Sequence, residues 1–472
     1  MKKYTALAEI QSLIAQQALR LTDLLEYYFQ QIEDHKHLNA FNEVFFLSAK
    51  KQAEIIQEKI DNRTAGKLAG MVIGIKDTIC YQDHLVTASS RMLEHFVAPY
   101  NATVVERLLA EDAIIIGRLN CDEFAMGGSN ETSYFGPVRN AADPERVAGG
   151  SSGGSAVAVQ ADMCLAALGT DTGGSVRQPA AFCGCIGLKP TYGRISRYGV
   201  IAYASSFDQV GTITSSVDDA ALLLEVLAGA DEHDSTVSEQ PVPAYSQTLV
   251  PSNKQKIAVL QETLESEALD PEIREAIVKG IEKLKADGHE IEYVSFDLLD
   301  YLVPAYYVLT AAEASSNLSR YDGVHYGYRN KDAKELNELY KRSRAEGFGP
   351  EVKRRIMLGT FILSAGYYDA YYQKAQKVRR LIRDKIESLL VNYDAILLPV
   401  TPTPAFKIGE NIKDPLVMYM EDIFTVLASL AGVPAISLPV GNNKAGLPLG
   451  IQLMAGHFHE NTLLNLSNSF LK

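Results

Sequence analysis

The chain has 472 residues, of which 47% are hydrophobic and 22% charged, proportions that are ordinary for a globular protein. Its formal net charge of -13 argues against a surface that holds a phosphate backbone unaided, because such surfaces need clustered Lys and Arg side chains. The five cysteines include no CxxC pair, so they fit reduced thiols better than a disulfide framework or a zinc site.

Met1 is followed by two lysines, as at the basic start of a signal peptide. Glu9 and Gln11 interrupt the apolar stretch that should follow, and there is no small-residue cleavage site. No apolar run approaches the ~18 residues of a membrane span. We therefore expect a cytoplasmic protein.

Residues 1–66 predict amphipathic helices. Apolar side chains recur there at helical spacing with polar residues between them, first at Leu13, Ile14, Leu21, Leu24, Leu25 and Tyr28, then at Ala49, Ala53, Ile56 and Ile60. The pattern then changes to short strand-type runs at 71–75 and 113–116, with a helix at 104–110 between them. Alternating helices and strands predict an α/β layer structure.

The stretch from Gly127 to Gly211 is rich in Gly, Ser and Thr, so much of it is expected to form loops and helix ends, where functional groups tend to lie. Helices are expected to dominate residues 301–390. Further elements are expected as strands at 256–260, 290–294, 395–398, 435–438 and 450–454, and as a helix at 271–286.

The return to strands near the C-terminus suggests that this segment completes the first sheet. We therefore expect residues 1–472 to form a single domain. It would comprise N-terminal helices (1–66), a Gly/Ser-rich catalytic core (67–230), a helical insertion (about 300–390) and a sheet-completing segment (391–472).

The run GGSSGGS at residues 149–155 allows several interpretations. A phosphate-binding loop would need a Lys followed by Ser or Thr after the second Gly, and the run has neither. G-x-S-x-G is matched around Ser151 and Ser152, but a nucleophile elbow also needs a preceding strand and a downstream His. His457 and His459 could formally serve, although no strand signal leads into the glycines.

Two other interpretations involve residues outside that run. The triplet Asp171-Thr172-Gly173 is typical of an aspartic protease, but that chemistry needs two such carboxylates and the chain has one triplet. A serine nucleophile needs a base, and Lys76 ends an apolar run, where burial would lower its pKa and allow a neutral amine. On that fact alone, a solvated lysine just past a strand is the favoured interpretation.

Taken together, GIKD at 74–77, GGSSGGS at 149–155 and DTGGSVRQP at 171–179 resemble the amidase signature family. The resemblance implies an α/β fold with a large mixed β-sheet covered by helices on both faces. It also implies a Ser-Ser-Lys triad, in which Ser175 is the nucleophile, Ser151 follows a cis peptide and relays the proton, and Lys76 is the base.

The same resemblance implies supporting roles around the triad. Ser152 supports the proton relay, and Asp171 with Arg177 braces the loop as an ion pair. The oxyanion hole is expected from the backbone N–H groups of Thr172, Gly173, Gly174 and Ser175.

Segments 121–133, 197–209, 231–236 and 351–360 extend the resemblance to the members of this family that act as glutaminase subunits of tRNA-dependent amidotransferases. For glutamine, this implies Arg355 as the partner of the α-carboxylate and Asp422 as the partner of the α-ammonium, with Tyr306 nearby. The neighbouring Arg354 leaves a one-residue ambiguity.

In this interpretation the ammonia passes to a B subunit, which contacts the tRNA and uses ATP and magnesium to convert Glu-tRNA(Gln) to Gln-tRNA(Gln), or Asp-tRNA(Asn) to Asn-tRNA(Asn). A small C subunit completes a heterotrimer. The glutaminase step needs no metal or organic cofactor. The alternative is a stand-alone amidase that acts on another small amide through the same triad, without the glutamine-binding residues.

Overall fold

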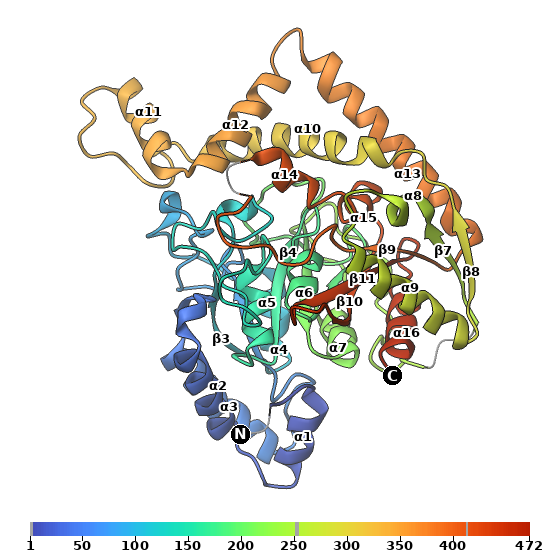
Figure 1. Cartoon of the computed structure of the whole chain (residues 1–472). Helices are drawn as coiled ribbons and strands as arrows, with labels where there is room; N and C mark the ends of the chain where they lie inside the picture. Colours follow the sequence, from blue (N-terminus) through green and yellow to red (C-terminus); the bar gives the residue numbers. More distant parts are fainter. Residues whose placement is uncertain (1–2, 251–253, 412–413) are drawn as a thin grey trace.

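The computed structural model describes residues 3–250, 254–411 and 414–472, and one sheet of 11 strands runs through them (Figure 1). The strands are β1 (Phe41–Val44), β2 (Val72–Lys76), β3 (Ile114–Leu119), β4 (Ala166–Asp171), β5 (Ile186–Lys189), β6 (Gln209–Thr214), β7 (Lys256–Leu260), β8 (Glu290–Val294), β9 (Ala395–Pro399), β10 (Ala435–Asn442) and β11 (Pro448–Met454). Their order across the sheet is β1-β3-β2-β4-β6-β5-β10-β11-β9-β7-β8.

The sheet is mixed. β2 is parallel to β3 and β4, and β7 is parallel to β8 and β9, whereas the other neighbouring pairs are antiparallel. β5 lies between β6 and β10, so strands from residues 391–472 continue the sheet that the earlier strands begin. That the whole chain is one domain with a helical insertion remains a prediction.

Along the sequence, the α-helices lie before, between and after these strands. They are α1 (Leu7–Ala15), α2 (Leu21–Asp34), α3 (Phe46–Asp61), α4 (Thr103–Ala110), α5 (Gly153–Gln160), α6 (Arg177–Phe182), α7 (Val217–Leu227), α8 (Gln261–Glu265), α9 (Pro271–Ala286), α10 (Leu299–Asn317), α11 (Leu336–Gly347), α12 (Pro350–Ile362), α13 (Lys374–Asn392), α14 (Pro415–Met420), α15 (Val426–Ala431) and α16 (Glu460–Leu471), with a π-helix at Tyr368–Gln373.

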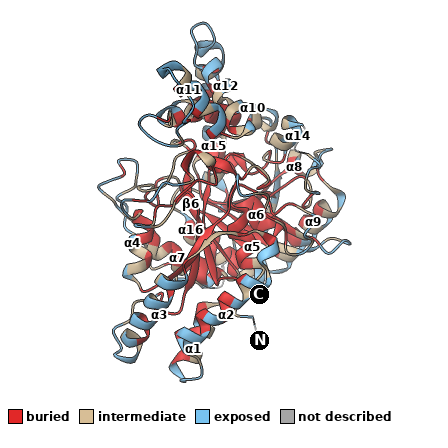
Figure 2. Ribbon diagram, turned by 90° about the vertical axis from the view of Figure 1, so that its left-hand side faces the viewer, coloured by how far each residue is buried: buried red, intermediate tan, exposed pale blue. Residues whose placement is uncertain are grey.

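Helices cover both faces of the sheet, as two consecutive residues of β11 illustrate. A Cβ atom on Gly450 would meet Ala181 of α6, 2.7 Å away. Ile451, which points to the opposite face, lies 3.4 Å from the Cβ position of Gly280 in α9, and Phe470 of α16 lies equally close to that position. Buried residues gather in the sheet and in the helices on it (Figure 2). The expected α/β fold is confirmed.

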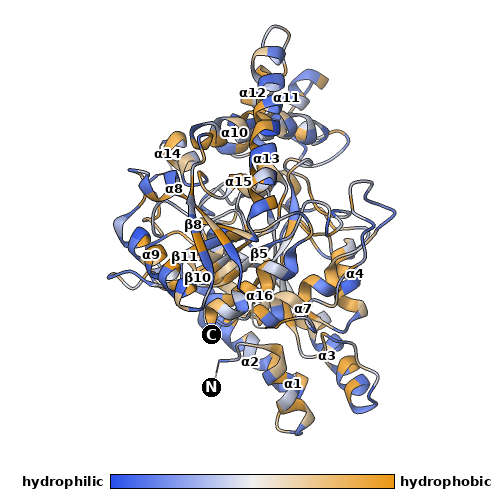
Figure 3. Cartoon of the chain, turned by 90° about the vertical axis from the view of Figure 1, so that its right-hand side faces the viewer, coloured by the Kyte–Doolittle hydropathy of each residue, from blue (hydrophilic) through white to orange (hydrophobic). Residues whose placement is uncertain are grey.

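The N-terminal helices are amphipathic, as predicted, and carry hydrophilic and hydrophobic residues side by side (Figure 3). The prediction of helices alone over residues 1–66 is wrong at one place, because β1 lies between α2 and α3 and pairs with β3 in antiparallel fashion. The sequence pattern does not reveal this strand, because it is only four residues long and half-buried throughout, which is too short to show a clear period.

Parallel neighbours place two functional segments at one edge of the sheet. β2 ends at Lys76 and the adjacent parallel strand β4 ends at Asp171, so the chain leaves both strands on the same side. In Figure 1, α10, α12 and α14 lie above this edge. Polar groups at these strand ends therefore meet beneath a helical cover.

Two further features concern the cysteines and the length of the helices. The five cysteines are free thiols and all are buried. In the described parts of the chain, no helix is long and apolar enough to cross a membrane.

Candidate active site

Lys76 lies fully buried at the end of β2. Its Nζ is 2.7 Å from Ser151 Oγ, 2.9 Å from Ser152 Oγ and 2.9 Å from Thr170 Oγ1. Three hydroxyl groups from two segments thus surround the amine. The sequence alone allowed a solvated lysine here, and the burial rules that interpretation out.

The surroundings of Lys76 favour its neutral form. Burial lowers the pKa of Lys76 to about 8, and the nearby carboxylates of Asp122, Asp171 and Asp208 oppose this shift without overcoming it. An amine with this pKa is partly neutral near physiological pH and can accept a proton. No carboxylate forms an ion pair with it among the described residues.

Ser151 follows a cis peptide bond after Gly150, as the resemblance implied. The backbone on both sides of this bond is held by hydrogen bonds: Gly150 N–H donates to Gln178 Oε1 (2.8 Å), and Asp122 N–H donates to the carbonyl of Ser151 (3.1 Å). Ser152 follows directly and donates from its backbone N–H to the carbonyl of Ser175 (3.1 Å). The two serine-bearing segments are therefore joined.

The loop that carries Ser175 is held by a buried ion pair. Arg177 donates from Nε and Nη2 to the two carboxylate oxygens of Asp171, at 2.9 and 2.8 Å, and both side chains are fully buried. Asp171 also accepts from the backbone N–H groups of Gly174 (2.9 Å) and Val176 (3.2 Å). Arg177 lowers the pKa of Asp171 against the effect of burial. The ion pair braces the loop, as expected.

The glycines of this loop stand where side chains do not fit. A Cβ atom on Gly173 would lie 2.4 Å from the hydroxyl oxygen of Tyr306, and one on Gly174 would lie 2.3 Å from Thr425 Oγ1. Gly174 also has a φ of +137°, which other residues rarely adopt. Gly174 was expected to be one of the oxyanion donors, but its N–H group already donates to the carboxylate of Asp171.

Thr172, at the start of this loop, is held by Asp208. The threonine hydroxyl donates to Asp208 Oδ1 (2.7 Å), and the same carboxylate accepts from the backbone N–H groups of Tyr203 and Ala204. Burial raises the pKa of Asp208 to about 6. This carboxylate connects the loop to the segment that carries Tyr203.

Arg355 of α12 is buried in a group of tyrosines. Its Nη1 donates to the hydroxyl of Tyr203 (2.7 Å), its Nε pairs with Glu351 (2.8 Å), and its guanidinium lies 5.2 Å from the ring centroid of Tyr307 and 5.5 Å from that of Tyr419. Its neighbour on α12, Arg354, has a side chain that is 46% exposed. Both arginines line the neighbouring cavity, but only Arg355 is buried among the tyrosines.

Asp422 lies close to this group. The hydroxyl of Tyr307 donates to Asp422 Oδ2 (2.6 Å), and burial raises the pKa of Asp422 to about 6. Tyr306, which was expected beside the substrate, is buried in α10 with its ring against Gly173. The side chain of Tyr307 therefore contacts both Arg355 and Asp422.

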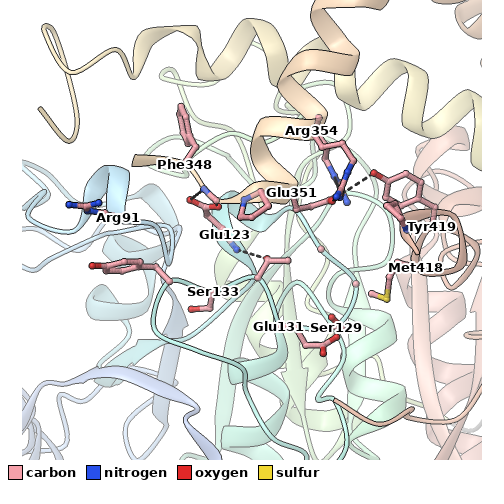
Figure 4. A pocket seen from close by; sticks show the side chains of 18 of the residues that line it. Arg91, Glu123, Ser129, Glu131, Ser133, Phe348, Glu351, Arg354, Met418 and Tyr419 are labelled. Carbon is pink, nitrogen blue, oxygen red and sulfur yellow. Dashed lines mark hydrogen bonds and ion pairs between the residues drawn. The ribbon is translucent and has the colours of Figure 1, made fainter. Parts of the chain in front are cut away.

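A cavity of about 550 Å³ opens beside these residues. Figure 4 shows Glu351, Arg354 and Tyr419 on one side of it and Arg91 on the other, with Glu131 and Ser129 below. Tyr307 and Arg355 also line this cavity, as does Gly128. A small molecule in this cavity can thus reach Arg355 and Tyr307, whereas Lys76, Ser151 and Ser175 are not among the residues that line it.

The structure brings Lys76 together with Ser151 and Ser152, and a backbone hydrogen bond joins Ser152 to Ser175. Arg355 and Asp422 meet around Tyr307. Sequence reasoning missed the residues that surround the guanidinium of Arg355. Tyr307 adjoins the predicted Tyr306, and Tyr203 and Glu351 lie in the segments 197–209 and 351–360 that carry the resemblance, but none of them was assigned a role. No sequence signal pointed to Tyr419. Within residues 3–250, 254–411 and 414–472, no group of three or more His, Cys, Asp or Glu side chains could hold a metal ion.

Comparisons with known proteins agree with this geometry. The family model described as Amidase matches residues 23–464. The A subunit of the glutamyl-tRNA(Gln) amidotransferase of Koribacter versatilis is 51% identical over 451 residues, which cover 95% of this chain and 94% of that protein. The protein of the same name from Bdellovibrio bacteriovorus is 50% identical over 471 residues, with 98% and 96% covered.

A solved structure of a protein with the same name is also similar to this chain over most of its length. The crystal structure of the glutamyl-tRNA(Gln) amidotransferase A subunit from Thermotoga maritima has a TM-score of 0.78 and 40% identity to this chain, covering 95% of it and 91% of the solved chain. The chain therefore belongs to the amidase family, and these three relatives within the family are A subunits of glutamyl-tRNA(Gln) amidotransferases.

Proposed function

We propose that this protein is the glutaminase subunit of a tRNA-dependent amidotransferase and hydrolyses glutamine through Lys76, Ser151 and Ser175. The observation that carries the proposal is the buried amine of Lys76, which lies 2.7 Å from Ser151 Oγ at the same sheet edge as the Ser175 loop. Serine needs a base to become a nucleophile, and a neutral lysine amine can serve as one.

In the first step, neutral Lys76 takes a proton from Ser151, while Ser151 takes the proton of Ser175. Ser175 Oγ then forms a bond to the side-chain amide carbon of glutamine. The tetrahedral oxyanion is stabilised by backbone N–H groups of Thr172 and Gly173, with Ser175 contributing its own, because donors fixed in advance cost no reorganisation. Gly174 instead holds the loop through its hydrogen bond to Asp171.

When the intermediate collapses, the carbon–nitrogen bond breaks and the leaving nitrogen receives a proton through Ser151, which leaves ammonia and an acyl-enzyme on Ser175. Water, deprotonated by the same relay, attacks the ester and releases glutamate. One water is consumed, and the triad returns to its starting protonation state. Ser152 supports the relay, since its hydroxyl also contacts the amine of Lys76 (2.9 Å).

The charged groups beside the cavity suit the two ends of glutamine. A guanidinium is the natural partner of the α-carboxylate, and a carboxylate is the natural partner of the α-ammonium. We assign these roles to Arg355 and Asp422, and the exposure of Arg354 supports this choice between the two arginines. Tyr306 forms the wall of the site next to Gly173.

We further propose that the ammonia passes to a B subunit, which uses ATP and magnesium to amidate Glu-tRNA(Gln) or Asp-tRNA(Asn), and that a C subunit completes a cytoplasmic heterotrimer. The names of the relatives support an assembly of several subunits. The net charge of -13 is consistent with a division of labour in which the B subunit makes most of the contacts with tRNA.

The test is ammonia release from glutamine by the purified chain, alone and with its B and C subunits. We expect glutaminase activity that depends on the partners and is lost in Ser175→Ala. Ser437→Ala is the matched control, because Ser437 is a buried serine whose hydroxyl has no partner among the described residues. Hydrolysis of another amide, with no glutaminase activity under any condition, would assign the protein to the stand-alone amidases instead.

The base is tested by comparing two buried lysines. Lys76→Met should abolish activity, whereas Lys189→Met should retain it. Lys189 is also buried, and burial lowers its pKa to about 7, but its amine donates to the carbonyl of Pro190, away from the serines. Equal activity losses in the two variants would contradict the assignment of Lys76 as base.

A further inference from the structure

Gln178 has a buried amide nitrogen that the proposed mechanism does not use. The residue lies on α6, three positions after Ser175, and is fully buried. Its Oε1 accepts the backbone N–H of Gly150 (2.8 Å). Its Nε2 has no hydrogen-bond partner among the described residues.

The orientation of this amide is fixed by its surroundings. If oxygen and nitrogen were exchanged, the Nε2 group of Gln178 would face the N–H of Gly150, so that two donors would meet. The unpaired atom is therefore the nitrogen. Buried donors without a partner are unfavourable and rare in native proteins, which suggests that a ligand supplies the missing acceptor.

The free amide nitrogen lies beside the cavity. The position that a Cβ atom on Gly128 would occupy is 3.6 Å from Gln178 Nε2 and 3.9 Å from Asp422 Oδ1, and Gly128 lines the cavity. The other oxygen of Asp422 already accepts from Tyr307, so Oδ1 is the atom available on this side. The donor Gln178 Nε2 and the carboxylate oxygen Asp422 Oδ1 therefore both lie close to the same position beside Gly128.

This pair matches the head group of an α-amino acid, in which an ammonium and a carboxylate are attached to one carbon. We propose that Gln178 is a specificity-determining residue that donates a hydrogen bond from Nε2 to the carboxylate of an α-amino-acid amide, whose ammonium binds Asp422. The inference rests on the proposed glutaminase function and adds a second ligand for the carboxylate besides Arg355.

The two ends of Gln178 then have separate roles. Oε1 holds the backbone before Ser151, so its loss affects the hydrolysis of every amide substrate. Nε2 contacts a group that only α-amino-acid substrates have, so its loss affects those substrates alone. This difference distinguishes the proposal from a purely structural role for the residue.

The experiment compares two substrates that differ by one group, glutamine and 4-aminobutanamide, which lacks the α-carboxylate. The assembled enzyme with its B and C subunits is assayed as wild type and as Gln178→Leu. We expect the ratio of kcat/KM for glutamine to kcat/KM for 4-aminobutanamide to fall about 10-fold or more in the variant, since a hydrogen bond to a charged group has roughly that effect.

A second variant covers the case in which Gln178→Leu does not fold. Gln178→Glu keeps an acceptor for Gly150 and, at pH 9, presents a negative charge to the substrate carboxylate, so the ratio should fall by about 100-fold. Gln160→Glu is the matched control: Gln160 Oε1 also accepts a backbone N–H, from Ala141 (3.0 Å), and the residue is outside the site. Its ratio should equal that of the wild type.

The outcomes separate the inference from the function on which it rests. If the wild-type assembly releases no ammonia from glutamine, the proposed function fails. If the wild type is active and both Gln178 variants keep the wild-type substrate ratio, whatever their overall rate, Gln178 is only a structural anchor and the inference is overturned.

Discussion

The pH dependence of glutamine hydrolysis follows from the burial of Lys76. The amine must be neutral to accept a proton, and burial lowers its pKa to about 8. Because the neutral form is the active one, kcat/KM should rise with pH through this value rather than fall. An ordinary exposed lysine, with a pKa near 10.4, would place the rise more than two units higher.

The size of the effect can be worked out from that pKa. With a pKa of about 8, about one-tenth of the lysine is neutral at pH 7, about half at pH 8 and about nine-tenths at pH 9. Each unit below pH 7 should then cost about a factor of ten in kcat/KM. Burial also raises the pKa of Asp422 to about 6, so below pH 6 the protonation of this carboxylate should make the fall steeper.

The assay is the initial rate of ammonia release at low glutamine concentration between pH 5.5 and 9.5, with the intact fold checked by circular dichroism at each end. Asp122→Asn supplies an independent test, because the negative charge of Asp122 raises the pKa of Lys76 and its removal should move the rise to lower pH. A rate that is constant from pH 6 to 8.5, or a shift to higher pH in Asp122→Asn, would refute the reasoning.

Three substitutions test other parts of the site. Gly173→Ala places a methyl group against Tyr306 and should reduce kcat by about 100-fold through displacement of an oxyanion donor, whereas unchanged kcat would remove Gly173 from that role. Arg355→Lys should raise KM for glutamine about 10-fold with little change in kcat, since an ammonium lacks the planar fork of donors; an unchanged KM would argue against the carboxylate contact. Asp171→Ala leaves Arg177 buried without its partner and should lower the free energy of unfolding in urea by about 3–5 kcal/mol, and a loss below about 1 kcal/mol would show that the ion pair is replaceable.

The sequence predicted the parts of the site that lie at the ends of regular elements. Lys76 follows an apolar run, and the run proved to be β2, so its position at the sheet edge follows from the strand ending there. The ion pair between Asp171 and Arg177, which flank one short loop, was also expected from the family resemblance. Local patterns suffice where the partners are close in sequence.

Apart from the triad, which the resemblance implied, the contacts between distant segments in the site were not predicted. Tyr203 and Arg355 are 152 positions apart, and Tyr307 and Asp422 are 115 apart, so no local period relates them. The side chain of Gln178 illustrates the same limit, since only the placement of Gly150 and Gly128 distinguishes its used oxygen from its unused nitrogen. Which of two adjacent arginines is buried depends likewise on how α12 is rotated against its neighbours.

The position of β5 between β6 and β10 determines when this protein can first work during its synthesis. Until the ribosome has released residues 435–442, one edge of β5 has no partner, and unpaired edges invite aggregation. Arg177 likewise lacks two of its acceptors until the chain has reached Thr425 and Gln452. The nascent chain therefore cannot release ammonia before its late strands emerge, and the residues that precede β10 are the span over which a chaperone has the most to protect.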